Sequence, residues 1–208
     1  MSELGFVHRY VPPKDGTPLT LLLLHGTGGN ENDLLPLGAQ LAPGAGLLSP
    51  LGKVRENGMP RFFRRLAEGV FDQVDLRLRT EELADFVAGA SAHYGFDPGR
   101  VIALGYSNGA NIAASILMTV PETLKGGALL HAMVPFVPEV APDLRGKQIF
   151  LGAGQNDPIV PRNETIRLER MLSEFGADVE TDWFASGHQL SAAELKAAGA
   201  WLSRFQLS

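Results

Sequence analysis

The amino-acid sequence predicts an α/β protein, a three-layer α/β/α sandwich with a mostly parallel central sheet. Short apolar runs alternate along the chain with segments of helical periodicity, which is the pattern of parallel strands covered by helices on both faces. Several of these apolar runs lead directly into loops rich in glycine or polar residues. In an open parallel sheet such loops gather at the carboxyl ends of the strands, where ligands bind.

Two strands are expected first. Residues 6–11 alternate loosely between apolar and polar side chains and end at Pro12 and Pro13, which predicts an edge strand. The composition of residues 14–18 predicts a turn. The continuous apolar run 19–24 then predicts a strand buried on both faces of the sheet.

A helix is expected next over residues 31–41, capped by Asn30 or Asn32. The short apolar run 46–49 predicts another strand. Glycine and proline at both ends of residues 50–60 predict a loop there.

Residues 61–75 are mixed in pattern, with a weak helical start over 62–68. A clearer helix is expected from Thr80, which can cap it, because acidic residues follow in the first turn and apolar residues recur at helical spacing. We expect this helix to end near Gly95 and a turn at 97–100 to lead into the next strand.

The second half of the chain continues the alternation of strands and helices, and it contains one proline-rich loop. The expected strands cover 100–104, 126–131, 148–151 and 179–184, the helices 110–117, 162–175 and 190–205, and the loop 134–142. Little length remains for an inserted lid domain, so we expect no large lid and a lightly covered site.

Composition and charge exclude several classes of protein. The 208 residues are 45% hydrophobic and 20% charged, with a net charge of −5 and no cysteine, which suits a single globular domain over residues 1–208. The acidic balance argues against a nucleic-acid partner. Without cysteine the chain has no disulfides, thiolate zinc sites or cysteine nucleophile.

The sequence gives no sign of export or of a membrane span. Residues 1–5 lack the basic-then-apolar pattern of a signal peptide. The longest apolar run, 19–24, is far too short to cross a bilayer. We therefore expect a cytoplasmic protein.

A G-x-S-x-G motif at residues 105–109 lies between a predicted strand and a predicted helix. This placement is typical of a nucleophile elbow, a sharp turn that exposes the serine, here Ser107. Its glycines leave room for the close approach of strand and helix. For the pentapeptide alone, a simple glycine- and serine-rich loop stays an alternative.

A serine nucleophile needs a histidine base, which a carboxylate orients. In this architecture the chain order is serine, acid, histidine. Asp157 and His188 each follow a predicted strand, so with Ser107 they end three strands at one edge of the sheet. His131 is the other histidine downstream of Ser107, and Asp157 could instead form an Asx turn. Three rival acids are less well placed: Asp143, Asp178 and Asp182.

Acyl transfer also needs donors for the developing oxyanion. We expect one to be the backbone N–H of Asn108, the residue after the nucleophile. The other is expected from the glycine-rich loop 25–29, with Thr27 as donor through its backbone N–H or hydroxyl. His25 is expected to hold this loop. A phosphate-binding loop is the weaker alternative, because the Walker lysine and the G-x-G-x-x-G spacing are both missing.

These motifs resemble the α/β-hydrolase fold and, more narrowly, the small bacterial carboxylesterases of the phospholipase/carboxylesterase family, relatives of acyl-protein thioesterases. The resemblance covers nearly the whole chain and is carried by residues 25–30, 105–109, 155–161 and 187–188. It implies a serine hydrolase that cleaves small carboxylic esters through an acyl-enzyme and needs neither metal nor organic cofactor. A homodimer is compatible with the resemblance.

Residues 60–63 resemble the stretch that carries an aromatic wall in the branch linked to hydroquinone-induced hydrolases. Phe62 and Phe63 are expected either to line a substrate pocket or to pack in the core. His131 and Met133 end a strand at the active edge, where they either touch substrate or belong to the core.

Three arginines near this stretch, Arg61, Arg64 and Arg65, either face a substrate carboxylate or form a solvated charge run, which we favour.

Two alternative functions stay open at this point. One is a thioesterase or lysophospholipase acting on acyl-CoA, acylated protein or lipid. Thioesterase relatives usually carry glutamine after the nucleophile, where this chain has Asn108, which weighs against protein deacylation. The other is a non-catalytic ligand-binding protein on the same fold, against which the complete set of Ser107, Asp157 and His188 argues.

Overall fold

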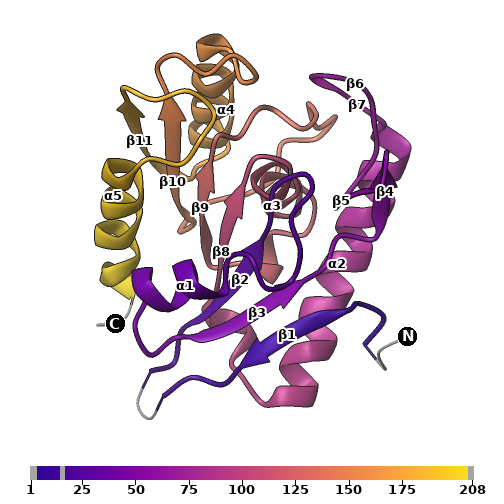
Figure 1. The fold of residues 1–208 in the computed structure, drawn as a ribbon, viewed down its shortest axis with the longest axis vertical. Helices are drawn as coiled ribbons and strands as arrows, with labels where there is room; N and C mark the ends of the chain where they lie inside the picture. Colours follow the sequence, from indigo (N-terminus) through magenta and orange to yellow (C-terminus); the bar gives the residue numbers. More distant parts are fainter. Residues whose placement is uncertain (1–3, 15–16, 206–208) are drawn as a thin grey trace.

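A computed structural model of the chain describes residues 4–14 and 17–205 (Figure 1). Its centre is a seven-stranded sheet with the order β1-β3-β2-β8-β9-β10-β11, in which β1 runs antiparallel to β3 and every other neighbouring pair is parallel. The strands are β1 (His8–Val11), β2 (Thr20–Leu24), β3 (Gly46–Pro50), β8 (Val101–Tyr106), β9 (Gly126–Leu130), β10 (Gln148–Gly154) and β11 (Asp178–Phe184). Residues 1–3 of the N-terminal segment and 15–16 of the predicted turn lie outside the described residues.

Helices cover both faces of this sheet, which confirms the predicted three-layer sandwich. They are α1 (Leu35–Leu41), α2 (Gln73–Tyr94), α3 (Asn108–Thr119), α4 (Arg162–Glu174) and α5 (Ala192–Leu202), with short 3₁₀ turns at Pro98–Arg100, Pro121–Thr123 and Ser203–Phe205. Helices α2, α3 and α4 pack on one face, and α1 and α5 pack on the other. Within the described part of the chain, no helix combines the length and hydropathy needed to cross a membrane.

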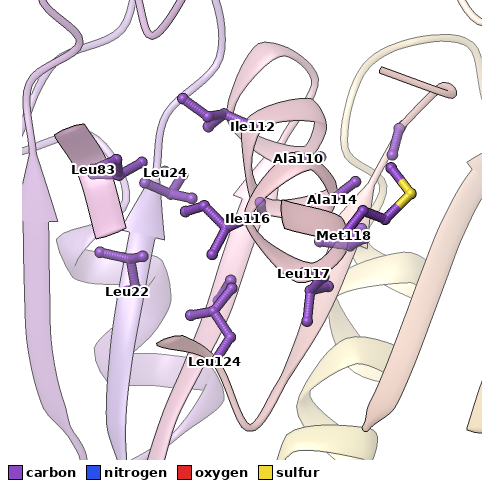
Figure 2. Packing of buried hydrophobic residues seen from close by; sticks show 14 of the residues in the cluster. Leu22, Leu24, Leu83, Ala110, Ile112, Ala114, Ile116, Leu117, Met118 and Leu124 are labelled. Carbon is purple, nitrogen blue, oxygen red and sulfur yellow. The ribbon is translucent and has the colours of Figure 1, made fainter. Parts of the chain in front are cut away.

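The strands divide their side chains between the two faces with the period of two that extended chains impose. In β2, Leu22 and Leu24 belong to the core under α2, α3 and α4, while Leu21 and Leu23 belong to the core under α1 and α5. Figure 2 shows Ile116 of α3 on the side of the helix that faces the β2 leucines. The continuous apolar run of β2 is therefore explained by burial on both faces.

Two small hairpins replace the loop predicted over 50–60 and the helical start predicted over 62–68, and both predictions were wrong. The four short strands are β4 (Val54–Glu56), β5 (Met59–Arg61), β6 (Arg65–Ala67) and β7 (Val70–Phe71). Asn57 and Gly58 join β4 to β5 with φ values of 50° and 82°. Positive φ at both residues of a two-residue turn is the geometry that Asn-Gly favours. The Asn-Gly pair in the sequence could therefore have predicted this hairpin.

Helix α2 begins at Gln73, seven residues before the predicted start. Asp72 caps it by accepting a hydrogen bond from the backbone N–H of Asp75. Thr80, the predicted cap, is instead buried inside the helix, where its hydroxyl hydrogen-bonds with the Leu76 carbonyl and the Ser115 hydroxyl. A threonine that satisfies its hydroxyl within a helix loses the capping role that its type favours. The predicted end at Gly95 is confirmed.

Helix α1 is shorter than predicted because it begins at Leu35 rather than at residue 31. The Asn30 side chain accepts the backbone N–H of Asn32 at 2.8 Å, which forms a turn instead of a cap. Pro36 then occupies the first helical turn, where its missing N–H costs nothing.

The elbow glycine Gly109 lies too close to the backbone of β2 to carry a side chain. A Cβ at this position would overlap the Leu24 carbonyl, which is backbone and cannot rotate away. We expect Gly109→Ala to lower the free energy of unfolding by about 3 kcal/mol or more. The control is Gly89→Ala in α2, where the nearest atom is 3.5 Å from the added Cβ; this variant should gain about 0.5–1 kcal/mol from helix propensity. Equal urea midpoints for the two variants would contradict the prediction.

Candidate active site

Ser107 lies at the turn between β8 and α3, with φ 54° and ψ −115°. Positive φ is costly for a residue with a side chain and concentrates at functional sites. The turn is possible because Gly105 carries no Cβ, which would lie 2.7 Å from the Gly109 carbonyl oxygen. The backbone N–H of Ser107 donates to the Leu130 carbonyl of β9 at 2.9 Å. Strand β9 therefore holds the turn from the side.

Ser107, His188 and Asp157 form one chain of hydrogen bonds. His188 Nε2 lies 2.9 Å from Ser107 Oγ, and His188 Nδ1 lies 2.8 Å from Asp157 Oδ2. The three residues follow β8, β11 and β10, whose carboxyl ends lie at the same edge of the sheet. The Tyr106 hydroxyl donates to the His188 carbonyl at 2.8 Å and fixes the loop that carries the histidine. The geometry allows His188 to take a proton from Ser107.

The Asp157 side chain is almost completely buried, and both of its oxygens are hydrogen-bonded. Oδ1 accepts the backbone N–H groups of Ile159 and Val160 at 2.8 and 2.9 Å. Burial alone would raise the pKa of Asp157, but these backbone donors and the two histidines that contact Oδ2 outweigh it and hold the pKa below its usual value. Asp157 is thus an ionised carboxylate with a fixed orientation.

His131 contacts the same oxygen of this carboxylate as His188 does. Its Nδ1 lies 2.7 Å from Asp157 Oδ2, and its Nε2 lies 3.2 Å from Glu194 Oε2. Burial alone would lower the pKa of His131, but the hydrogen bonds and charges of Glu194 and Asp157 outweigh it and raise the pKa. Glu194 was not predicted as a site residue. In the sequence it is marked only as a helix-capping residue, three positions after Ser191.

The two expected oxyanion residues lie beside the nucleophile and border the same cavity. Thr27 Oγ1 accepts a hydrogen bond of 2.5 Å from Arg61 Nη1. The Asn108 side chain accepts the backbone N–H of Phe62 at 2.7 Å, which ties the elbow to the segment after β5. The His25 ring lies 2.7 Å from the Gly26 carbonyl through Nδ1 and accepts the Gly52 N–H through Nε2. His25 thus holds the loop, as expected.

Arg61, Arg64 and Arg65 do not form a solvated run, so that interpretation was wrong. Arg61 is only 3% exposed; besides Thr27, it contacts the Phe63 carbonyl at 3.2 Å and Glu56 at 3.2 Å. Arg65 also pairs with Glu56, at 2.8 Å. Arg64 is the most exposed of the three and pairs with Asp72 and Asp75. The short β4–β5 hairpin buries Arg61 by supplying Glu56.

A cavity of about 310 Å³ opens at Ser107. It is bordered by residues of the elbow, the Thr27 loop, the two hairpins and the loops after β9, β10 and β11, among them Arg61, Arg65, Phe71, Met133, Ile159 and His188. His131 also borders it but exposes no surface. Phe62 and Phe63 are absent from its described lining and are buried in the core, against His25 and Phe71 respectively. The structure thus favours the core alternative for both phenylalanines.

His131, Asp157 and His188 also present ligand atoms that all lie within 4.8 Å of one another, close enough for a cation. Each imidazole, however, uses Nδ1 in a hydrogen bond to Asp157 Oδ2. A nitrogen that donates a hydrogen bond has no lone pair for a metal. The cluster is therefore explained by hydrogen bonding among its own members.

Known proteins resemble this chain in sequence and in fold. The phospholipase/carboxylesterase family model matches residues 64–205. The chain is 50% identical over 193 residues to MhqD of Bacillus subtilis, named as a hydrolase, covering 93% of this chain and 96% of that protein. A carboxylesterase of Bacillus cereus has a similar crystal structure, with a TM-score of 0.95 at 47% identity over 98% of this chain and 96% of that one. An acyl-protein thioesterase 1 of Cryptococcus neoformans is 26% identical over 175 residues, covering 74% of this chain and 72% of that protein. The chain belongs to the phospholipase/carboxylesterase family on the α/β-hydrolase fold and is a carboxylic ester hydrolase.

Proposed function

We propose that residues 1–208 form a single-domain, cytoplasmic serine esterase that cleaves small carboxylic esters through an acyl-enzyme. The observation that carries this proposal is the unbroken chain of hydrogen bonds from Asp157 through His188 to Ser107. Ser107 lies on a strained elbow that opens to a cavity. These are the groups and the geometry that nucleophilic acyl transfer requires.

In the first half of the reaction, Ser107 Oγ attacks the ester carbonyl while His188 Nε2 takes the serine proton. Asp157 holds the proton of His188 on Nδ1, which leaves Nε2 free to act as the base, and it stabilises the imidazolium that forms. His188 then gives the proton to the leaving alcohol as the carbonyl–oxygen bond breaks. In the second half, His188 takes a proton from water, the hydroxide attacks the acyl-enzyme, and Ser107 leaves with the proton returned to it.

The developing oxyanion lies at the start of α3. The backbone N–H of Asn108 belongs to the first turn of that helix, where N–H groups have no acceptor within the helix and the helix dipole favours negative charge. Thr27 is the proposed second donor. Because Thr27 Oγ1 already accepts from Arg61, its own hydrogen is free to point at the oxyanion. Arg61 supplies a buried positive charge behind this donor.

The size of the cavity supports small esters as substrates. At about 310 Å³ it lies at the lower end of the range for small-molecule sites, roughly 300–1,000 Å³. Two short hairpins border it, and no large lid stands over it among the described residues. A short acyl or aryl ester fits such a volume, whereas a long lipid chain or an acylated peptide needs a longer groove.

Active-site labelling and a substrate series test the proposal. A fluorophosphonate probe should add one covalent group to Ser107, found by intact mass and peptide mapping. Short p-nitrophenyl esters should be turned over with higher kcat/KM than acyl-CoA or an S-acylated peptide. Lack of labelling would overturn the serine mechanism, and a preference for acyl-CoA or the acylated peptide would replace the substrate class by a thioester.

A further inference from the structure

The chain of hydrogen bonds does not stop at Asp157, because it continues into two buried ionisable groups. His131 follows β9 and Glu194 lies in the first turn of α5, and both are fully buried. The imidazole of His131 bridges the carboxylates of Asp157 and Glu194, at 2.7 and 3.2 Å. The described hydrogen bonds thus run Ser107–His188–Asp157–His131–Glu194 without a break.

The backbone is shaped to hold this pair. His131 has φ 56°, in the left-handed region that few residues with side chains adopt, and its N–H donates to the Gly152 carbonyl at 2.8 Å. Gly152 lies directly against Glu194, since a Cβ on this glycine would lie 2.6 Å from Glu194 Oε1. A strained residue directly after β9 and a glycine in β10 thus make room for two buried ionisable side chains.

Stability alone does not explain why Glu194 is an acid. Its Oε2 accepts the Ser191 N–H in a helix-capping box, a role that glutamine fills equally well. Its Oε1 is buried without a hydrogen-bond partner among the described residues. Burying an ionisable group in this way is costly unless its charge is used. The contact with His131 is the use that the structure offers.

We propose that His131 and Glu194 are positioning residues for the catalytic triad, in which Glu194 orients His131 and His131 fixes the Asp157 carboxylate that orients His188. This inference rests on the proposed serine mechanism. With Glu194 as the acceptor at Nε2, His131 presents Nδ1–H to Asp157 Oδ2. That oxygen then accepts two imidazole N–H groups, while Oδ1 accepts two backbone N–H groups. Four donors leave the carboxylate one orientation.

The groups facing His131 come from four elements. They are Asp157 after β10, Glu194 in α5, the His188 ring at a centroid distance of 5.1 Å, and the Tyr106 ring at 5.9 Å. Two carboxylates bound to one imidazole favour its protonated form. A positive charge on His131 disfavours a second one in the same cluster, so its removal should move the acidic limb of the kcat/KM profile to higher pH.

The first pair of variants changes His131. Glycine and asparagine both tolerate the left-handed backbone, and the asparagine amide lies near the position of the imidazole Nδ1. We expect His131→Gly to lower kcat by about 10- to 100-fold, as loss of an orienting partner commonly does, with little change in KM. His131→Asn should recover much of that loss, because it can still donate to Asp157. The acidic limb of the kcat/KM profile should move to higher pH in both variants.

The second pair of variants separates positioning from helix capping. Glu194→Gln keeps the cap but removes the charge that favours a proton on His131, so the acidic limb should again move to higher pH. Ser191→Ala removes the cap on the same helix and keeps the contact between Glu194 and His131. We expect this control to melt at a lower temperature with an unchanged pH profile.

The outcomes separate this inference from the proposed function. If folded His131→Gly keeps the kcat of the parent enzyme and folded Glu194→Gln keeps its pH profile, the positioning role is wrong. If Ser191→Ala shifts the profile as much as Glu194→Gln does, the effect is structural and the inference also fails. If the fluorophosphonate probe labels Ser107 in the parent protein, the serine mechanism stands in either case. Failure to label Ser107 would overturn both the serine mechanism and the positioning role.

Discussion

Replacing Ser107 by alanine is expected to lower kcat for ester hydrolysis by about 10⁶-fold, as removal of a triad serine does elsewhere. The reason is that His188 Nε2, 2.9 Å from the serine oxygen, then has no nucleophile to activate. Steady-state kinetics with a short p-nitrophenyl ester measures the loss. Intact mass spectrometry during turnover should show an acyl adduct on the parent protein and none on the variant.

The strained backbone provides a control for this variant. Ser107→Gly also removes the nucleophile, but glycine adopts φ 54° without steric cost. We expect Ser107→Gly to be as inactive as Ser107→Ala and to melt at a higher temperature than it. Turnover by either variant at more than about a thousandth of the parent rate would contradict the nucleophile assignment, because residual catalysis without the triad is small.

The main strands and their mostly parallel pairing could be predicted from the sequence because burial on both faces leaves a strong pattern. The β2 run and the G-x-S-x-G motif each identify a strand end locally, and parallel pairing brings such ends to one edge. The chain order of Ser107, Asp157 and His188 then predicts which residues approach one another. This inference needs no distances, since the topology supplies the proximity.

What the sequence did not predict depends on contacts between distant segments. Arg61 looks like one of a run of surface arginines, yet Glu56 and Thr27 surround it once two hairpins fold over the elbow. Glu194 looks like an ordinary capping residue, and only the packing of α5 against β10, the neighbour of β9, brings it to His131. Local pattern gives residue type and element, but not the tertiary partner that decides its role.

Asp157→Asn is expected to lower kcat by about 10⁴-fold, because an amide no longer enforces the tautomer of His188 in which Nε2 is the base. Here the substitution also disturbs four hydrogen bonds. Each carboxylate oxygen accepts two N–H groups. Whichever way the asparagine amide turns, its NH₂ group therefore faces two N–H donors that have lost their acceptor. Leaving buried donors unpaired should lower the free energy of unfolding by about 1–3 kcal/mol. The matched control is Asp143→Asn, which changes an exposed aspartate paired with Arg145 and should leave kcat unchanged.

The stability of Asp157→Asn should also change less than that of the parent protein when the pH is lowered. The pKa of Asp157 is lower in the folded protein than its usual value, so the unfolded chain takes up the proton first as pH falls. The stabilisation from this group is therefore complete above about pH 4, the usual range of the unfolded carboxyl, and is lost as pH falls through the lower folded pKa. Asp157→Asn lacks this contribution at every pH. We expect the unfolding free energies of the parent protein and Asp157→Asn to differ most near neutral pH and to converge on acidification. Urea titrations between pH 7 and 3 measure this difference. A constant difference across that interval would show that Asp157 is not held ionised by the donors around it.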